Sequence, residues 1–212
     1  MTVNNYIKMQ NINNIIFDLG GVIMNIDVKR TQKAFTEMGV KNINDYFGHG
    51  FAASFFKDHE SGKISDEVFV QKIKEEIRLD LADSKVINAW NALLLNFPPE
   101  RIVLLEEIKK KYRIFLFSNT NAIHHKRFME IYRQAYPESE LDDHFEKAYY
   151  SHILGHRKPD KPGFEIIIKE NRLDPQETLF VDDAFINVEA AIRCGLKGLY
   201  LPPGMSINDI RW

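Results

Sequence analysis

The sequence predicts an α/β fold, in which a Rossmann-like parallel sheet core carries helices on both faces and holds an inserted all-helical cap. Residues 14–19 form a short strand that is apolar on both faces, as strands of a doubly covered parallel sheet are. Residues 28–97 show only helical patterns. After Pro98-Pro99, helices and strands alternate, which implies right-handed crossovers between parallel strands.

The helical stretch lies between the first strand and the rest of the sheet, so it is interpreted as an insertion. We expect residues 1–27 and 98–212 to form the α/β core and residues 28–97 to form the cap. The cap should hold a helix from Val28 that stops before Gly39, a short one over 51–59, one capped by Ser65 with a stripe of Val68, Phe69, Ile73 and Ile77, and one from Asp83 or Ser84 that contains Trp90.

The core elements are predicted from the alternation of helical and strand patterns after the two prolines. Buried strands are expected at 113–117, 148–150, 178–181 and 198–201. Helices are expected between them, at 100–111, 121–135, 162–171 and 186–194.

Composition excludes several classes of protein. The 28 basic and 30 acidic residues give a net charge of -2, which lacks the basic excess of a nucleic-acid binder. No apolar run is long enough for a membrane helix, and the N-terminus has no signal-peptide pattern. Cys194 is the only cysteine, so an internal disulfide is impossible. We therefore expect a soluble cytoplasmic protein, as a monomer or weak dimer.

Polar side chains gather where the predicted strands end. Asp18 ends the first strand, Ser118-Asn119 follows the second, and Asp182-Asp183 ends the strand before the last helix. Each group alone is ordinary turn or capping chemistry. Ligands of open α/β sheets bind beyond the carboxyl ends of the strands, and these groups all fall at that one edge.

Three clustered carboxylates call for a cation. Two carboxylates 4 Å apart repel by about 1 kcal/mol in water and about 4 kcal/mol at an effective dielectric near 20. Mg²⁺ suits such an oxygen site, because it uses one or two carboxylates together with a substrate phosphate. Lys158 and the Ser118 hydroxyl complement a phosphate from the other side. We interpret the group as a nucleophile, a metal site and an anion clamp.

Four segments resemble the motifs of the haloacid dehalogenase (HAD) superfamily of hydrolases, in matching order and spacing. They are FDLGGVI, FSNTN, RKPD and FVDDAFINVEAAIRCGL, and the resemblance covers nearly the whole chain. HESGKISDEVF, LFSNTN and RKPD further resemble the bacterial α-D-glucose-1-phosphate phosphatase branch, whose cap is helical.

The resemblance implies a role for each matching residue. Asp18 would be the nucleophile that forms an aspartyl-phosphate, which water then cleaves. Ser118 and the Asn119 backbone would bind phosphate oxygens, and Lys158 would neutralise the phosphate and help to keep Asp18 ionised.

The resemblance also implies a Mg²⁺ site. Its ligands would be Asp18, Asp183 and the Gly20 carbonyl, with Asp182 bound directly or behind them. Asn187, one helical turn past Asp183, would orient a metal-bound water or would simply be a polar residue of a first helical turn.

Gly20 departs from the superfamily pattern, because many of its phosphatases carry an acid there that protonates the leaving group. Three explanations remain open. In the first, the substrate has a leaving group that needs little protonation, such as the anomeric hydroxyl of a sugar 1-phosphate. In the second, the chain is a metal-independent 2-haloacid dehalogenase, whose halide leaves without a proton. In the third, the chain is a non-catalytic regulatory module that binds a phosphate ligand.

The segment FGHGFAASFFKDHESGKIS is expected to set specificity from the cap. At least two of Phe51, Phe55 and Phe56 should pack inside the cap, and His49 is the candidate for a substrate hydroxyl. The sequence thus predicts a Mg²⁺-dependent phosphatase for a small phosphorylated metabolite, such as glucose 1-phosphate.

Overall fold

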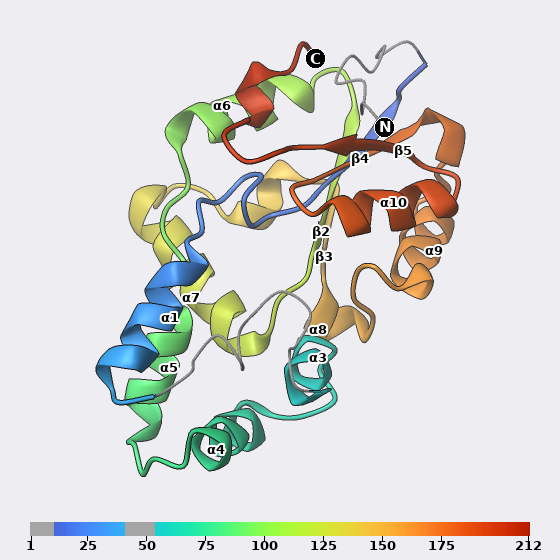
Figure 1. Cartoon of the computed structure of the whole chain (residues 1–212). Coiled ribbons are helices and arrows are strands. Elements are labelled where there is room, and N and C mark those ends of the chain that lie inside the picture. Colours follow the sequence, from blue (N-terminus) through green and yellow to red (C-terminus); the bar gives the residue numbers. More distant parts are fainter. Residues whose placement is uncertain (1–10, 41–53) are drawn as a thin grey trace.

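The core of the molecule is a parallel β-sheet. The computed structural model describes residues 11–40 and 54–212. Within these residues five strands pair in the order β3-β2-β1-β4-β5, with all four pairings parallel (Figure 1). The strands are β1 (Asn14–Phe17), β2 (Arg113–Ser118), β3 (Lys147–Tyr150), β4 (Thr178–Asp182) and β5 (Lys197–Tyr200). The predicted fold class is confirmed.

Both faces of the sheet are buried, which explains the unbroken apolar runs of the strands. Ile15 and Phe17 of β1 belong to one hydrophobic cluster, and Ile16 between them belongs to another. In strands, successive side chains point to opposite faces, so alternate residues of β1 supply the two cores. Helices on either side cover these clusters.

The covering helices come from the connections between strands. The first cluster contains side chains of α6 (Pro99–Ile108) and α7 (Ala122–Ala135). The second contains side chains of α9 (Lys161–Glu170) and α10 (Phe185–Arg193). Short helical turns complete the connections: α8 (Ser151–Leu154), η1 (Leu141–His144), η2 (Pro175–Glu177) and η3 (Ile207–Asp209).

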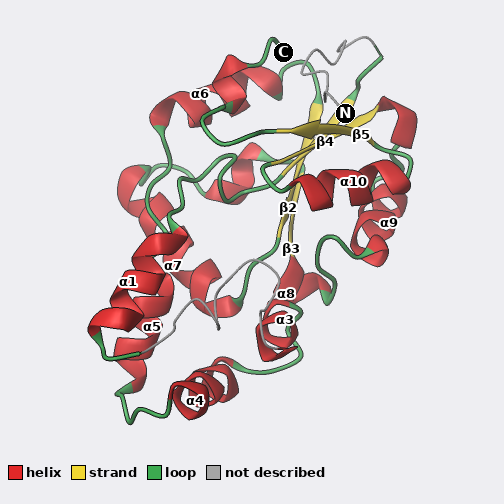
Figure 2. Cartoon of the chain, viewed as in Figure 1, coloured by secondary structure: helices red, strands yellow, loops and turns green. Residues whose placement is uncertain are grey.

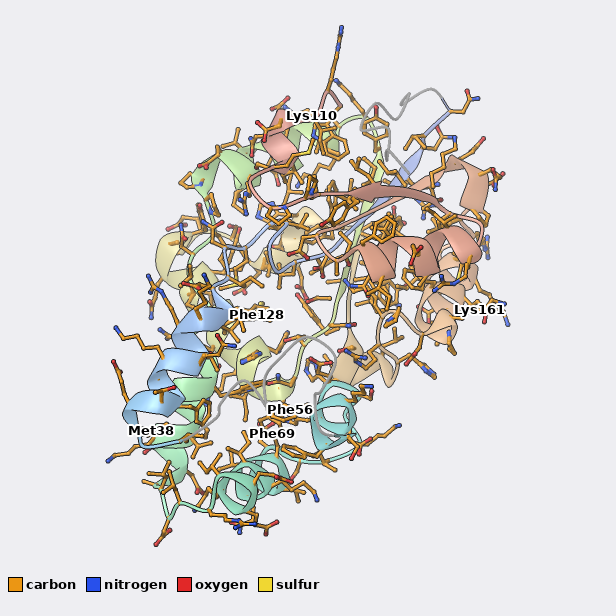
Figure 3. All side chains as sticks on the ribbon, viewed as in Figure 1. Met38, Phe56, Phe69, Lys110, Phe128 and Lys161 are labelled. Atoms are coloured by element: carbon orange, nitrogen blue, oxygen red, sulfur yellow. The ribbon has the colours of Figure 1, made fainter. Side chains whose placement is uncertain are left out.

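The helices before α6 pack around a third hydrophobic cluster, to which α7 adds Ile123. They are α1 (Val28–Glu37), α3 (Ser54–Glu60), α4 (Asp66–Ile77) and α5 (Asp83–Asn91). Phe56 and Phe69 lie together inside this group, with ring centroids 5.4 Å apart (Figure 3). Phe55 and Phe56 are both buried in the cluster, as predicted, whereas Phe51 and His49 lie outside the described residues. In the described part of this region, helices and loops alone make up the fold (Figure 2).

Two polypeptide segments connect these helices to the sheet. They run side by side, with the Asn25 and Asp27 N–H groups donating to the carbonyls of Asn96 and Leu93 at 2.9 and 2.8 Å. His124 of α7 adds a bond to the end of α5, because its Nε2–H donates to the Trp90 carbonyl at 3.0 Å. Burial lowers the pKa of His124 to about 4, so the ring stays neutral near pH 7.

Several local predictions need correction. The first strand ends at Phe17 instead of residue 19, because a tight turn begins at Leu19. The Leu19 carbonyl accepts from the N–H groups of Ile23 and Met24. Ser65 caps α4 as expected, but Val68 is 43% exposed and Val70 takes its place in the core. The helix predicted over 100–111 ends at Ile108. Across the described residues, no helix has the length and apolar character that a membrane span requires.

Candidate active site

Strand order brings three predicted segments to one edge of the sheet. β1 lies between β2 and β4, so Asp18 follows a strand whose neighbours end in Ser118 and Asp182 (Figure 1). The ladder continues past β1, because the Asp18 N–H donates to the Val181 carbonyl at 2.9 Å. Phe17 pairs with Val181, so Asp18 and Asp182 occupy the next register position on adjacent strands.

Lys158 joins these two aspartates. Its ammonium donates to Asp18 Oδ1 at 2.6 Å and to Asp182 Oδ2 at 2.7 Å, and the lysine is only 1% exposed. Burial alone would lower the pKa of Lys158, but the two carboxylates outweigh it and hold the pKa above its ordinary value. The ammonium therefore stays charged, and it sits where it can meet an anion approaching Asp18.

The third carboxylate completes a possible metal site. One oxygen from each of Asp18, Asp182 and Asp183 lies within 4.8 Å of the others. An all-oxygen donor set of this kind fits Mg²⁺, which keeps several waters and takes few protein ligands. The residues present therefore fit the expected ion.

The three aspartates are not equivalent. Asp182 is fully buried, and both of its oxygens accept hydrogen bonds: Oδ1 from the Ala184 N–H at 2.7 Å, and Oδ2 from Lys158. Asn187 Nδ2 also donates to this carboxylate, at 3.1 and 3.2 Å. Asp183 is partly exposed. This arrangement favours Asp18 and Asp183 as ligands, with Asp182 and Asn187 holding the surrounding groups in place.

Burial sets the acidity of the Asp18 and Asp183 carboxyl groups. It raises the pKa of Asp18 to about 7, opposed by Lys158 and assisted by Asp182 and Asp183. Burial and the Asp182 charge raise the pKa of Asp183 to about 6. A divalent cation at this position would favour the ionised forms of both groups.

The two glycines after Asp18 meet different surroundings. A Cβ atom on Gly21 would lie 2.1 Å from Asp183 Oδ2, and Gly21 has φ of 76°. Position 21 therefore admits only glycine while the Asp183 carboxylate stays where it is. A Cβ on Gly20 would lie 3.3 Å from Cδ1 of Ile26, so an apolar side chain occupies the space beside the position of the absent acid.

The loop after β2 is held from both sides. The Asn119 side chain exchanges two hydrogen bonds of 2.8 Å with the Lys158 backbone. The buried Ser151 hydroxyl donates to the Thr120 carbonyl and accepts from the Thr120 N–H, both at 2.9 Å. Ser118 is buried at the start of this loop.

Comparison with models of protein families shows to which family the chain belongs. A family model described as haloacid dehalogenase-like hydrolase matches residues 12–195. The chain belongs to this family. The enzyme class predicted from the motifs is thereby supported, and Mg²⁺ is the cofactor that fits the donor set of this HAD-like hydrolase.

Similar proteins are known from bacteria and a fungus. The HAD-like hydrolase is 29% identical to a D-ribitol-5-phosphate phosphatase of Bacteroides thetaiotaomicron, over 88% of this chain and 90% of the relative. It is 25% identical to the sesquiterpene phosphatase AstK of Aspergillus oryzae, over 90% of both chains.

A solved structure is also similar. An aspartate-to-alanine variant of a HAD-family enzyme of B. thetaiotaomicron, in complex with magnesium and inorganic phosphate, matches with a TM-score of 0.87. It is 31% identical, and the match covers 93% of this chain and 98% of that one.

Three features of the HAD-like hydrolase went unnoticed in the sequence. They are the contact between Gly21 and Asp183, the bonds of the Ser151 hydroxyl to the Thr120 backbone, and the pairing of Asn119 with Lys158. The second glycine of FDLGGVI was a usable signal for the contact with Asp183, because paired glycines mark tight turns of the backbone. The other two join residues 31 and 39 positions apart, and only the fold brings them together.

Proposed function

We propose that this HAD-like hydrolase is a Mg²⁺-dependent phosphatase that acts on small phosphorylated sugars or sugar alcohols. The observation that carries the proposal is the buried ammonium of Lys158, shared between Asp18 and Asp182 at 2.6 and 2.7 Å beside the Asp183 carboxylate. A phosphate monoester needs a nucleophile and cations that neutralise its oxygens, and the pairing of Asp18 with Lys158 beside a donor set for Mg²⁺ supports both roles.

In this proposal, Asp18 attacks phosphorus with a carboxylate oxygen while the bond between phosphorus and the leaving oxygen breaks. The product is an aspartyl-phosphate on Asp18, and attack by water on its phosphorus then releases phosphate and restores the carboxylate. Lys158 orients Asp18 and neutralises the transferring group, and Ser118 and the Asn119 N–H bind phosphate oxygens. Mg²⁺ bound by Asp18, Asp183 and the Gly20 carbonyl would supply further charge neutralisation.

The leaving group receives no proton from position 20, since Gly20 has no side chain and Ile26 lies beside it. Loss of general acid help typically costs 10²–10⁴ in rate. We therefore expect aryl and anomeric phosphates, whose leaving groups are better, to react faster than primary alkyl phosphates. Water that enters with the substrate is the proton donor in this proposal.

The cap would set the substrate's size and shape. We propose the predicted division, with residues 28–97 as a cap over a core of residues 1–27 and 98–212, because α1, α3, α4 and α5 share a hydrophobic cluster to which the core adds only Ile123 among its described buried residues. The role of His49 in binding a substrate hydroxyl belongs to the same proposal. Similarity to a ribitol-phosphate phosphatase supports a sugar-alcohol or sugar phosphate as the substrate class.

The haloacid and binding-module alternatives fit the site less well. A haloacid carries a carboxylate, which the neighbouring Asp182 and Asp183 charges would repel. A module that only binds phosphate needs no nucleophile, yet Asp18 is held by Lys158 in a fixed position.

A substrate panel tests the proposal. Glucose 1-phosphate, D-ribitol 5-phosphate, an aryl phosphate and 2-chloropropionate are each incubated with the protein in Mg²⁺ or EDTA. We expect phosphate release from the esters in Mg²⁺ alone. Chloride release in EDTA would select the dehalogenase, and ligand binding without any release would select the binding module.

A further inference from the structure

The Asn119 side chain pairs with the backbone of one residue. Its Nδ2 donates to the Lys158 carbonyl at 2.8 Å, and its Oδ1 accepts from the Lys158 N–H at 2.8 Å. One amide group thus satisfies both backbone groups of Lys158, in the way that a neighbouring strand would. Asn119 directly follows the last residue of β2, so the bond pair joins the end of the central sheet to a loop 39 residues away.

The other end of Lys158 is held as tightly. Its ammonium bridges Asp18 and Asp182, and it lies 5.5 and 5.4 Å from the ring centroids of Phe117 and Phe180. Lysine has a flexible four-carbon stem, so fixing the ammonium position also requires a fixed Cα position. Among the described residues, the Asn119 amide is the group that bonds both backbone atoms of Lys158.

We propose that the Asn119 side chain is a positioning residue, which fixes the Lys158 backbone so that the ammonium reaches both Asp18 and Asp182. This inference rests on the proposed phosphatase function. It assigns the side chain of Asn119 a task separate from that of its backbone N–H, which faces the phosphate in the proposed mechanism. Both polar atoms of the side chain are engaged by Lys158, so the amide acts through the lysine rather than on the substrate.

A kinetic double-mutant cycle tests this assignment, with a Mg²⁺-dependent aryl phosphatase assay on the full chain. We expect Asn119→Ala to lower kcat by about 10- to 100-fold, because small displacements of a reacting group are costly, while KM changes less than about threefold. In the Lys158→Ala background, the same substitution should change kcat by less than about threefold, since the residue on which it acts is gone.

The matched control is Asn14→Ala. Asn14 is a buried asparagine at the opposite end of β1, and its Nδ2 donates to Thr178 Oγ1 at 3.1 Å. Its loss should lower the melting temperature but leave kcat within about twofold. If Asn119→Ala does not fold, Asn119→Ser gives the same cycle, because serine is too short to span both backbone groups.

Each outcome bears on the assignment. Non-additive losses in kcat support it. Losses that multiply across the two backgrounds, or a large rise in KM with kcat unchanged, would show that Asn119 contacts the substrate independently and would overturn this inference alone. A wild-type protein without phosphatase activity would instead overturn the proposed function, and this inference with it.

Discussion

The site depends on a small number of side chains that share one another's hydrogen bonds. Lys158 serves Asp18 and Asp182, and Asn187 donates to both oxygens of Asp182. Each member is buried, so a missing partner would leave a charge without compensation in a medium of low dielectric. The arrangement explains why Asp182 is better suited to hold Lys158 than to bind a metal directly.

Gly21 provides a test at the scale of one residue. We expect Gly21→Ala to raise the Mg²⁺ concentration for half-maximal activity by about 10- to 100-fold, because the new Cβ would lie 2.1 Å from Asp183 Oδ2. Titration of activity with Mg²⁺ measures the change.

The control for Gly21→Ala is Gly39→Ala. Gly39 also has a positive φ, of 93°, but a Cβ there meets no atom within 4 Å. It shares the backbone strain without the clash, so its Mg²⁺ requirement should match that of the wild type. An unchanged requirement in Gly21→Ala would show that Asp183 does not bind the metal.

At the scale of elements, helix α3 docks on the loop that carries Lys158. Glu60 ends α3, and its Oε2 accepts from Arg157 Nε at 2.8 Å. Nearby, a Cβ on Gly62 would lie 2.2 Å from the His152 carbonyl, so the turn after α3 packs directly on the segment after β3. Helix α3 and the loop that carries Lys158 therefore meet at a partly buried ion pair.

The ion pair is tested by a double-mutant cycle in urea unfolding. Glu60→Gln and Arg157→Gln should show a coupling of about 0.5–1 kcal/mol, because the side chains are only 28% and 21% exposed. The matched pair Lys33–Glu37 of α1 is 76% and 66% exposed, and its cycle should give about 0.3 kcal/mol. Equal couplings in the two cycles would contradict a structural role for the contact.

Element prediction succeeded where one chemical pattern dominates. The strands around Ile16, Phe115 and Phe180 are buried on both faces, so their unbroken apolar runs were unambiguous. Ser65 was a clear helix start because serine is a favoured N-cap residue. In the structure its hydroxyl accepts from the Val68 N–H. α8 escaped notice, since Ser151–Leu154 is a single turn without helical periodicity.

The sequence predicted which side chains would lie close together, but not the bonds between them. Strand ends and motif spacing predicted that Asp18, Lys158, Asp182 and Asp183 would meet at one edge, and the contacts among them agree. Their catalytic and metal-binding roles stay predictions. The motifs imply that Lys158 lies near Asp18, but they carry no signal that it also bonds Asp182. That second bond depends on the register between β1 and β4, which places Asp18 beside Asp182.

At the scale of the whole molecule, the carboxylates couple stability to pH. Burial raises the pKa of Asp18 from 3.8 to about 7 and that of Asp183 from 3.8 to about 6. Between about pH 4 and pH 7, the metal-free folded protein therefore binds more protons than the unfolded chain. Their contribution to stability is full below about pH 4 and is lost as the pH rises through 6 and 7.

Mg²⁺ should reverse this loss, because it binds the deprotonated carboxylates. At a Mg²⁺ concentration about 100 times its Kd, the stabilisation is about 3 kcal/mol, or a rise of about 5–10 °C in melting temperature. We expect a larger rise at pH 7.5 than at pH 5.5 by differential scanning calorimetry. NaCl of equal ionic strength is the control, and equal Mg²⁺ shifts at both pH values would contradict the proposed ligands.

The most direct test of the account measures phosphate release by the wild-type protein and by Asp18→Asn, with an aryl phosphate, in Mg²⁺ and in EDTA. We predict release by the wild type in Mg²⁺ alone, and a loss of at least about 10³-fold in Asp18→Asn, whose amide cannot attack phosphorus. Circular dichroism spectra should show that the variant is folded. Undiminished release by folded Asp18→Asn, or by the wild type in EDTA, would contradict the claim that Asp18 and a divalent cation carry out the reaction.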